Sequence, residues 1–283
     1  MALILPTFRF ARFVDNATTT ATVAPVEDTG VQSNTTGSAN VDTTPVTLLS
    51  ALAFDVHLLE VAFHQEGGAV DCNGLVDILI DPAGGTSWAE LISDIALSYH
   101  PYATVSSGLT YWLRFPLFIR AGSSLGVRHR AATGSLDFCA VARCHGEPSR
   151  PELWWCGQKV ETLGAAQPSA SKGTNVTPGN SNAWGSWTDI GASTRRYGAL
   201  ALGINGTDAS TLNTQYFFQI GAGGAQLPGT PQYMVAAGGA GAMQYITPAV
   251  PVWCDEPSGT TFQVRGMCAG TAETFNFTLH GVY

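Results

Sequence analysis

The second half of this 283-residue sequence repeats the pattern of the first half. Four short matches recur in the same order along the chain. Residues 37–40 (GSAN) match 179–182 (GNSN), 80–85 match 220–224, 115–128 match 250–265, and His145-Gly146 matches His280-Gly281. Solenoid repeats are only about 20–45 residues long, so a much longer unit present twice indicates a duplicated domain.

Each copy carries the alternation of apolar and polar residues that predicts β-strands. Near the C-terminus, Phe275, Phe277 and Leu279 alternate with polar side chains, and similar patterns cover residues 200–204 and 136–142. The run over residues 75–80 is almost wholly apolar, as in a strand that is buried on both faces. Frequent Gly and Asn-Gly turns separate these runs. We therefore expect an all-β chain of two tandem β-sandwiches, jelly-roll-like or immunoglobulin-like.

One segment of the first copy departs from this pattern. Its apolar residues fall at helical spacing, and Ser87 with Glu90 forms a capping box in front of them. These apolar residues are Trp88, Leu91, Ile92, Ile95, Ala96 and Tyr99. The spacing predicts one short helix in the first sandwich. The corresponding stretch of the second copy, residues 231–241, carries three glycines and predicts a loop or a frayed turn.

The repeat also divides the chain. The expected parts are an N-terminal docking segment (1–14), a first β-sandwich (15–147), a linker (148–159) and a second β-sandwich (160–283). Two prolines, Pro148 and Pro151, stiffen the linker. The docking segment has three phenylalanines, which are too apolar for a free tail and should pack on this subunit or on another one: Phe8, Phe10 and Phe13.

Composition and charge limit the kinds of partner that the protein is expected to bind. The net charge is −8, and only two of the 13 basic residues are lysines, Lys159 and Lys172. A nucleic-acid-binding surface needs clustered basic residues, so we expect no nucleic acid partner. The sequence has no apolar run near the roughly 18 residues of a membrane span. Its first residues do not form a secretory signal, so we expect a protein that is assembled in the cytoplasm.

Metal and cofactor sites are not expected. The six cysteines include no CxxC pair, which favours free and mostly buried thiols over a zinc site. His57, Glu60 and His64 would share one face of a helix and resemble a metal site. The surrounding residues favour a strand, on which the two histidines point to opposite faces.

No catalytic residue is expected either. The pairs Asp77/Asp81 and Asp71/Asp77 suggest glycosidase carboxylates, but neither pair recurs in the second copy. No sequence motif of a hydrolase or nucleotide-binding site is present. We therefore predict that the protein is not an enzyme.

Two residue types are shared by both copies. His145 and His280 each precede a glycine, and we expect hydrogen-bonded histidines at sheet edges. Arg128 and Arg265 should each bind a carboxylate or carbonyl at a corner of the sandwich.

Tryptophans are the candidates for contact with a partner. Trp154 and Trp155 lie at the joint between the copies and are expected to pack there. Trp184 and Trp187 lie in a Gly/Ser/Asn-rich loop and are predicted to contact a partner, either by stacking on sugars or by filling a protein interface.

The sequence also resembles a family of known proteins. The string FPLFIRAGSSLGVR (115–128), followed by PSRPE (148–152) and VETLG (160–164), resembles tailed-bacteriophage virion proteins that are described as structural or tail-associated. The likeness runs from about residue 37 over most of the chain. It implies a virion component, assembled in the bacterial cytoplasm, whose partners are other virion proteins and copies of itself.

Within the virion, we expect a place in the tail, collar or fibre apparatus used for adhesion, with a cell-surface glycan as a further partner. One alternative is a capsid decoration protein. An alternative of another class is a carbohydrate-binding module or a glycan-degrading enzyme.

Overall fold

The computed structural model describes residues 13–15, 30–65, 72–99, 111–136, 138–149, 151, 154–165, 168–206, 214–227, 233–237, 243–246, 251–270 and 273–283. Nearly all of the regular structure in these ranges is β-strand, with 3-10 turns at Pro151 and in η2 (Pro168–Ala170). No helix in the described part of the chain is long and apolar enough to cross a membrane.

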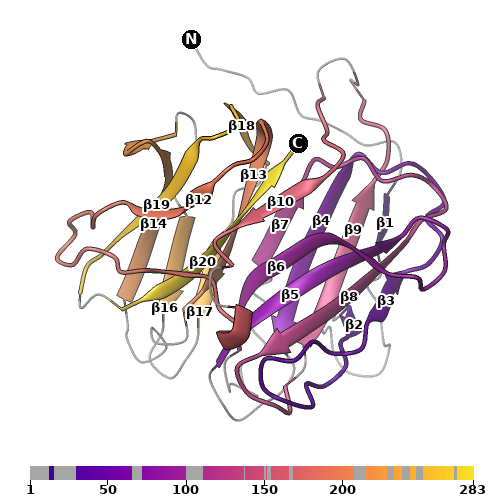
Figure 1. Cartoon of the computed structure of the whole chain (residues 1–283), viewed down its shortest axis with the longest axis horizontal. Helices are drawn as coiled ribbons and strands as arrows, with labels where there is room; N and C mark the ends of the chain where they lie inside the picture. The colour runs from indigo at the N-terminus through magenta and orange to yellow at the C-terminus, as the bar shows by residue number, and fades with distance from the viewer. Residues whose placement is uncertain are drawn as a thin grey trace.

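The strands of residues 13–145 form two antiparallel sheets that lie one over the other (Figure 1). One sheet has the order β1-β9-β4-β7, with β2 also paired to β9, and the other has the order β3-β8-β5-β6. The strands are β1 (Phe13–Asp15), β2 (Val31–Gln32), β3 (Val46–Leu49), β4 (Leu58–Gln65), β5 (Cys72–Asp81), β6 (Ala89–Tyr99), β7 (Tyr111–Phe115), β8 (Ser124–Ala131) and β9 (Phe138–His145).

The strands of residues 160–282 form two further antiparallel sheets. One has the order β10-β20-β13-β18, with β11 also paired to β20, and the other has the order β12-β19-β14-β16-β17, with β15 beside β14. The strands are β10 (Val160–Leu163), β11 (Thr174–Val176), β12 (Thr188–Ala192), β13 (Tyr197–Asn205), β14 (Thr214–Ala222), β15 (Ala225–Gln226), β16 (Tyr233–Ala237), β17 (Met243–Ile246), β18 (Val252–Glu256), β19 (Thr261–Cys268) and β20 (Phe275–Val282).

The two halves share one strand order. The β3-β8-β5-β6 sheet corresponds to β12-β19-β14-β16, and the β9-β4-β7 strands correspond to β20-β13-β18. Two four-stranded sheets connected in this way form a jelly roll. The tandem β-sandwiches predicted from the repeat are therefore confirmed, and of the two sandwich types the topology is that of the jelly roll.

The repeat extends to single backbone hydrogen bonds. Asn40 and Asn182, which end the first pair of matching strings, both adopt left-handed backbone conformations with φ of 59° and 60°. The Asn40 N–H donates to the Ala131 carbonyl over 2.7 Å, and the Asn182 N–H donates to the Cys268 carbonyl over 2.8 Å. Ala131 and Cys268 end the equivalent strands β8 and β19, so the two copies fix the same turn in the same way.

The predicted helix over residues 87–99 is wrong, because this segment forms strand β6. Val76 pairs with Ile95 and Ile78 pairs with Ile92, so three steps along β6 lie opposite two steps along β5. Asp94, with φ of 56°, accommodates this bulge. The bulge turns both isoleucines toward the core although they are three residues apart. A bulged strand thus imitates the apolar spacing of a helix.

Two other local expectations also fail. The capping-box residue Ser87 donates its backbone N–H to Asp81 over 2.8 Å, in the turn before β6. In the second copy, the expected loop over 231–241 contains strand β16, which pairs with β14. Residues 89–99 and 233–237 therefore belong to the sheets.

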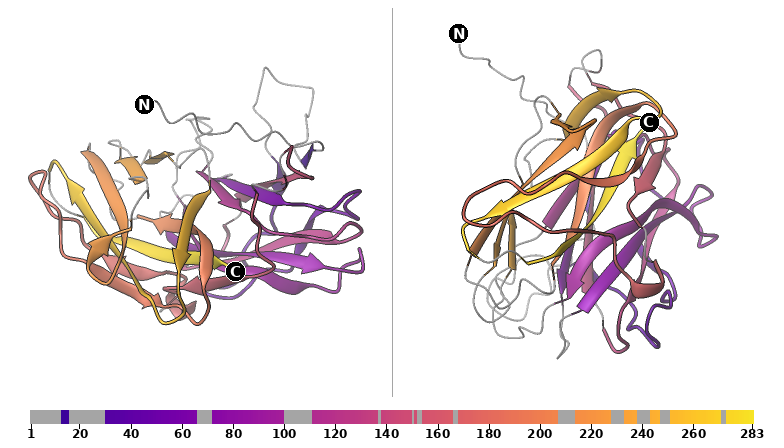
Figure 2. Two further views of the ribbon diagram at one scale, coloured as in Figure 1. Left: turned by 90° about the horizontal axis from the view of Figure 1, so that it is seen from above. Right: turned by 60° about the vertical axis from the view of Figure 1, so that its left-hand side comes forward.

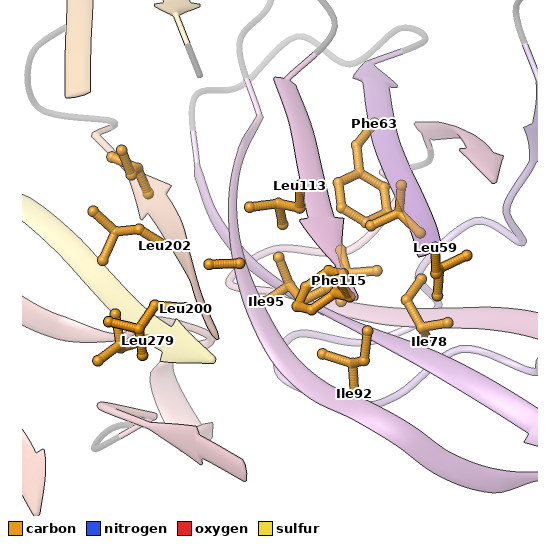
Figure 3. Close-up of a cluster of buried hydrophobic side chains, with 14 of the residues drawn as sticks. Leu59, Phe63, Ile78, Ile92, Ile95, Leu113, Phe115, Leu200, Leu202 and Leu279 are labelled. Atoms are coloured by element: carbon orange, nitrogen blue, oxygen red, sulfur yellow. The ribbon is translucent and has the colours of Figure 1, made fainter. Parts of the chain in front are cut away.

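The second sandwich covers the open side of the first (Figures 1 and 2). Strands β6 and β7 are the edges of the two sheets of the first sandwich, and both contact β13 of the second; β6 also contacts β10 and β20. Buried apolar residues form a single cluster that includes both sandwiches. Figure 3 shows Ile95 and Phe115 of the first sandwich near Leu200 and Leu202 of the second. Edges covered in this way are closed to pairing with other chains.

The linker binds both sandwiches. Gly157 donates its N–H to the Pro116 carbonyl of the first sandwich over 2.9 Å. Gln158 donates its N–H to the Tyr283 carbonyl of the second over 2.7 Å. The boundaries that the sequence predicts for the linker and the two sandwiches stay a prediction.

At the N-terminal end, Phe13 lies in β1, opposite His145 of β9, so this part of the expected docking segment belongs to the first sandwich. Phe8 and Phe10 lie outside the described residues.

Candidate binding site

Two of the three residues considered for a metal site, His57 and Glu60, have other partners, and the side chain of His64 lies outside the described ones. Glu60 accepts hydrogen bonds from Arg114 Nε over 2.7 Å and from His145 Nε2 over 2.9 Å. Burial alone would raise the pKa of Glu60, but the His145 hydrogen bond and the Arg114 charge hold it below its ordinary value. The His57 ring packs edge-on against Phe118, with centroids 5.6 Å apart. Nowhere in the described ranges do three His, Cys, Asp or Glu residues form a group that could hold a metal ion.

The two carboxylates that were considered as a catalytic pair, Asp77 and Asp81, have separate structural roles. Asp77 accepts hydrogen bonds from Arg128 Nε over 2.7 Å and from the Asp94 N–H over 2.8 Å. Asp81 caps the turn after β5 by accepting the N–H of Ala83 over 2.9 Å, and this bond lowers the Asp81 pKa. Asp71 lies outside the described residues.

The two shared arginines occupy the same register position. Arg128 lies opposite Asp77, and Arg265 lies opposite Gln219, on the outer faces of equivalent sheets. Arg128 binds the Asp77 carboxylate, and Arg265 donates from Nε and Nη2 to Gln219 Oε1 over 3.0 and 2.9 Å. The predicted partners, a carboxylate or a carbonyl, are found, but the predicted corner position is wrong because both arginines lie within strands.

Carboxylates surround the arginines of the first sandwich. Arg130 pairs with Asp42 over 3.0 Å and also binds Asp94. Desolvation raises the pKa of Asp94 to about 6, with the charges of Asp77, Glu90 and Asp42 adding to it, and Arg130 does not compensate. The outer face of this sheet is thus an ion-pair network.

Trp184 and Trp187 contact an arginine of their own chain. The Arg265 guanidinium carbon lies 5.0 Å from the Trp184 ring centroid and 4.3 Å from that of Trp187. Trp187 also lies over Gly221, where an added Cβ would come within 2.7 Å of the ring. Both indoles are half-buried. Their contact with a partner stays a prediction.

His280 lies in the contact between the two sandwiches, with none of its surface exposed. Its Nδ1 lies 3.0 Å from Thr162 Oγ1, and its Nε2 lies 3.1 Å from Thr278 Oγ1. These threonines bind β6, because Thr162 donates to the Ser93 carbonyl over 2.8 Å and Thr278 accepts the Ala96 N–H over 3.0 Å. Desolvation lowers the pKa of His280 to about 3.

His280 and His145 are hydrogen-bonded, as predicted. The edge position predicted for both is wrong, because β9 and β20 lie inside their sheets.

Among the residues whose burial is described, the most exposed aromatic side chains lie at the joint between the sandwiches. Trp155 is 41% exposed and Trp253 is 39% exposed. The Trp253 ring meets Trp154 at 5.3 Å and Trp155 at 6.3 Å between centroids, in edge-to-face geometry. We call Trp154, Trp155 and Trp253 the tryptophan platform. Trp154 packs at the joint as predicted, while Trp155 presents its ring to solvent.

The fold holds the platform in place from both sides. Trp154 Nε1 donates to the His57 carbonyl of the first sandwich over 3.2 Å. The Trp155 ring lies over Gly198 of β13, where an added Cβ would be 2.6 Å from it. Trp253 projects from the edge strand β18, which pairs with β13. The indoles are therefore fixed before any ligand arrives.

A planar polar pair lies beside the platform. Arg196 donates from Nε and from Nη2 to the two carboxylate oxygens of Asp255, over 2.7 Å each. The two side chains are 70% and 73% exposed. The hydrogen bond and charge of Arg196 lower the Asp255 pKa. Asp255 follows Trp253 by two residues in β18, and both side chains are exposed.

Trp253 and Asp255 were not among the candidates expected from the sequence. The signal was their alternation with Val252 and Cys254 in a short strand. The platform and its polar pair can offer flat apolar surface together with hydrogen-bond donors and acceptors.

The thiols of five of the six cysteines are described, and none of the five forms a disulfide: Cys139, Cys144, Cys156, Cys254 and Cys268. Burial raises the pKa values of Cys144 and Cys254 to about 12, so these thiols stay protonated.

No family model and no curated protein matches the sequence. Among solved structures, the chain is similar to PNGase F, a glycosylasparaginase from Flavobacterium meningosepticum, at 9% identity, 96% coverage of both chains and a TM-score of 0.39. A protein of Broad Bean Stain Virus matches at 10% identity, 92% coverage of both chains and a TM-score of 0.29. A human norovirus GI.7 particle protein matches at 10% identity, with 90% of this chain and 66% of that chain covered, and a TM-score of 0.21. Likenesses this distant do not assign a function.

Proposed function

We propose that this chain is a structural component of a bacteriophage virion that acts by assembly in many copies and not by catalysis. The observation that supports this best is the way in which the second jelly roll covers the open edges of the first. The contact includes the buried polar residues Thr278 and His280. The two sandwiches form one block with its own core, and such a block is suited to be a building unit that is repeated in a larger particle. Jelly rolls serve as viral capsid and lectin domains, which is an argument by analogy of fold.

The absence of catalysis is part of the proposal. It is supported by the roles of the groups considered for catalysis: Asp77 and Glu60 neutralise arginines, and Asp81 caps a turn. Purified protein should therefore hydrolyse neither glycans nor peptides. Hydrolysis that is abolished by a single carboxylate substitution would refute this.

Within the virion, we place the chain in the tail, collar or fibre apparatus, assembled in the bacterial cytoplasm. A stiff two-lobed unit suits a spacer or adaptor there. The alternative place is the capsid surface, as a decoration protein. The copy number in purified virions separates the two places.

Assembly can be tested through the N-terminus. We predict that deletion of residues 1–12 weakens self-association, because Phe8 and Phe10 are then lost as apolar contacts. The deletion stops before Phe13 and so keeps β1. Sedimentation velocity of the full chain and the deletion variant measures the effect, and circular dichroism checks that both are folded. Equal self-association of the two proteins would show that this segment is not the contact.

A further inference from the structure

We propose that the tryptophan platform and the Arg196–Asp255 pair form a binding site for a neutral glycan. The site lies along β18, an edge strand of the second sandwich (Figure 1). This inference does not rest on the virion role, because its residues would bind sugar in any setting.

The first argument is the chemistry of the exposed rings. One face of a pyranose presents C–H bonds, which carry a slight positive charge and fit the negative face of an indole. Trp155 and Trp253 are nearly perpendicular, with 78° between their planes, so a ring stacked on one meets the edge of the other. Neither indole N–H donates a hydrogen bond to any described residue, which leaves two donors for sugar hydroxyls.

The second argument is the polar pair. A guanidinium has five N–H donors, and Arg196 uses its Nε and Nη2 on Asp255, so further donors point to solvent. The Asp255 carboxylate retains lone pairs that can accept from sugar hydroxyls. The two charges cancel, which favours a neutral sugar over an acidic one. The pair is already held by its mutual hydrogen bonds, so little ordering is needed on binding.

The third argument is size. At 41% and 39% exposure, the two indoles present about 100 Å² each, taking about 250 Å² for a whole tryptophan. The total of about 200 Å² is less than half of the apolar area of a stable protein interface, which buries about 800 Å² per partner, of which about 57% is apolar. The only other exposed large apolar side chain in the described ranges is Val41, which lies in the first sandwich before β3. The platform therefore fits one or two sugar rings better than a second copy of the chain.

The test uses the full chain and a panel of neutral oligosaccharides. The panel contains α-glucan, β-glucan, mannan and β-1,4-linked N-acetylglucosamine hexasaccharides, each titrated by isothermal calorimetry. We expect at least one to bind, and we expect Trp253→Ala and Trp155→Ala each to weaken that binding at least tenfold. Trp253→Phe, which keeps an aromatic face, should retain most of it. Arg196→Ala should weaken binding less than the tryptophan substitutions do.

Val41→Ala is the matched control, because it truncates an exposed apolar side chain away from the platform. It should leave the affinity unchanged. The proposal is overturned if no oligosaccharide binds, or if both tryptophan variants bind as tightly as the unmodified chain. It is also overturned if Trp253→Ala abolishes self-association in sedimentation velocity, since the platform would then be a subunit interface. A failure of sugar binding leaves the copy number in virions, and with it the virion proposal, untouched.

Discussion

Phe218→Ala should lower the free energy of unfolding by about 3–5 kcal/mol, as expected for truncation of a fully buried phenylalanine. Phe218 lies at the centre of the second jelly roll with no exposed surface. Its ring centroid is 4.9 Å from that of Phe275 and 4.8 Å from that of Phe277, and the ring also lies against Gly266. Alanine would leave a cavity that these rigid neighbours cannot fill.

Urea unfolding followed by circular dichroism and tryptophan fluorescence measures this loss. The exposed control Val41→Ala should stay within about 0.5 kcal/mol of the unmodified protein. A loss below about 1 kcal/mol in Phe218→Ala would mean that the second core is not packed as described.

Acid should destabilise the fold well above the pH at which most carboxylates become protonated. Desolvation lowers the pKa of His280 to about 3 and that of His129 to about 4. The unfolded chain, with histidine pKa values near 6.5, then binds protons that the folded chain does not, so stability falls as the pH drops below about 6.5. Each histidine contributes a slope of about 1.4 kcal/mol per pH unit.

Asp94 acts in the opposite direction. Its pKa of about 6 in the folded chain lies above the ordinary value of 3.8, so it binds a proton more readily when folded and gains stability as the pH falls. Between pH 6 and 4 it offsets one of the two histidines, so that the net slope there is that of a single histidine. The sum from pH 7 to pH 4 is a loss on the order of 4 kcal/mol.

Urea unfolding at a series of pH values tests this account. His280→Gln keeps hydrogen-bonding groups for Thr162 and Thr278 but does not titrate, so its profile between pH 6 and 4 should be nearly flat. The exposed control Val41→Ala should keep the steep profile of the unmodified protein. If the His280→Gln profile is as steep as that of the unmodified protein, His280 does not cause the loss of stability in acid.

Much of the fold could be predicted from the sequence because the repeat and the strand alternation are local signals. The string that ends at Asn40 recurs at Asn182 because both residues form the same left-handed turn. The helix error at Ile92 and Ile95 arose because a bulge gives a strand the spacing of a helix. The intrinsic propensities of these residues do not by themselves distinguish a bulged strand from a helix.

The contact between the sandwiches could not be predicted. The polar face of β20, with Thr278 and His280, has the pattern of a solvent-facing strand, yet the first sandwich covers it. That burial depends on the docking of two distant parts of the chain. For the same reason, Trp155 at the joint could be expected to pack, whereas the structure exposes its ring beside Trp253.

The number of copies per particle tests the virion proposal most directly. Quantitative mass spectrometry of purified virions should find this chain at a few to a few tens of copies per particle, as expected for a tail, collar or fibre component. Hundreds of copies, in proportion to the major capsid protein, would contradict the tail placement and assign the chain to the capsid surface. Absence of the chain from purified particles would contradict the structural role itself.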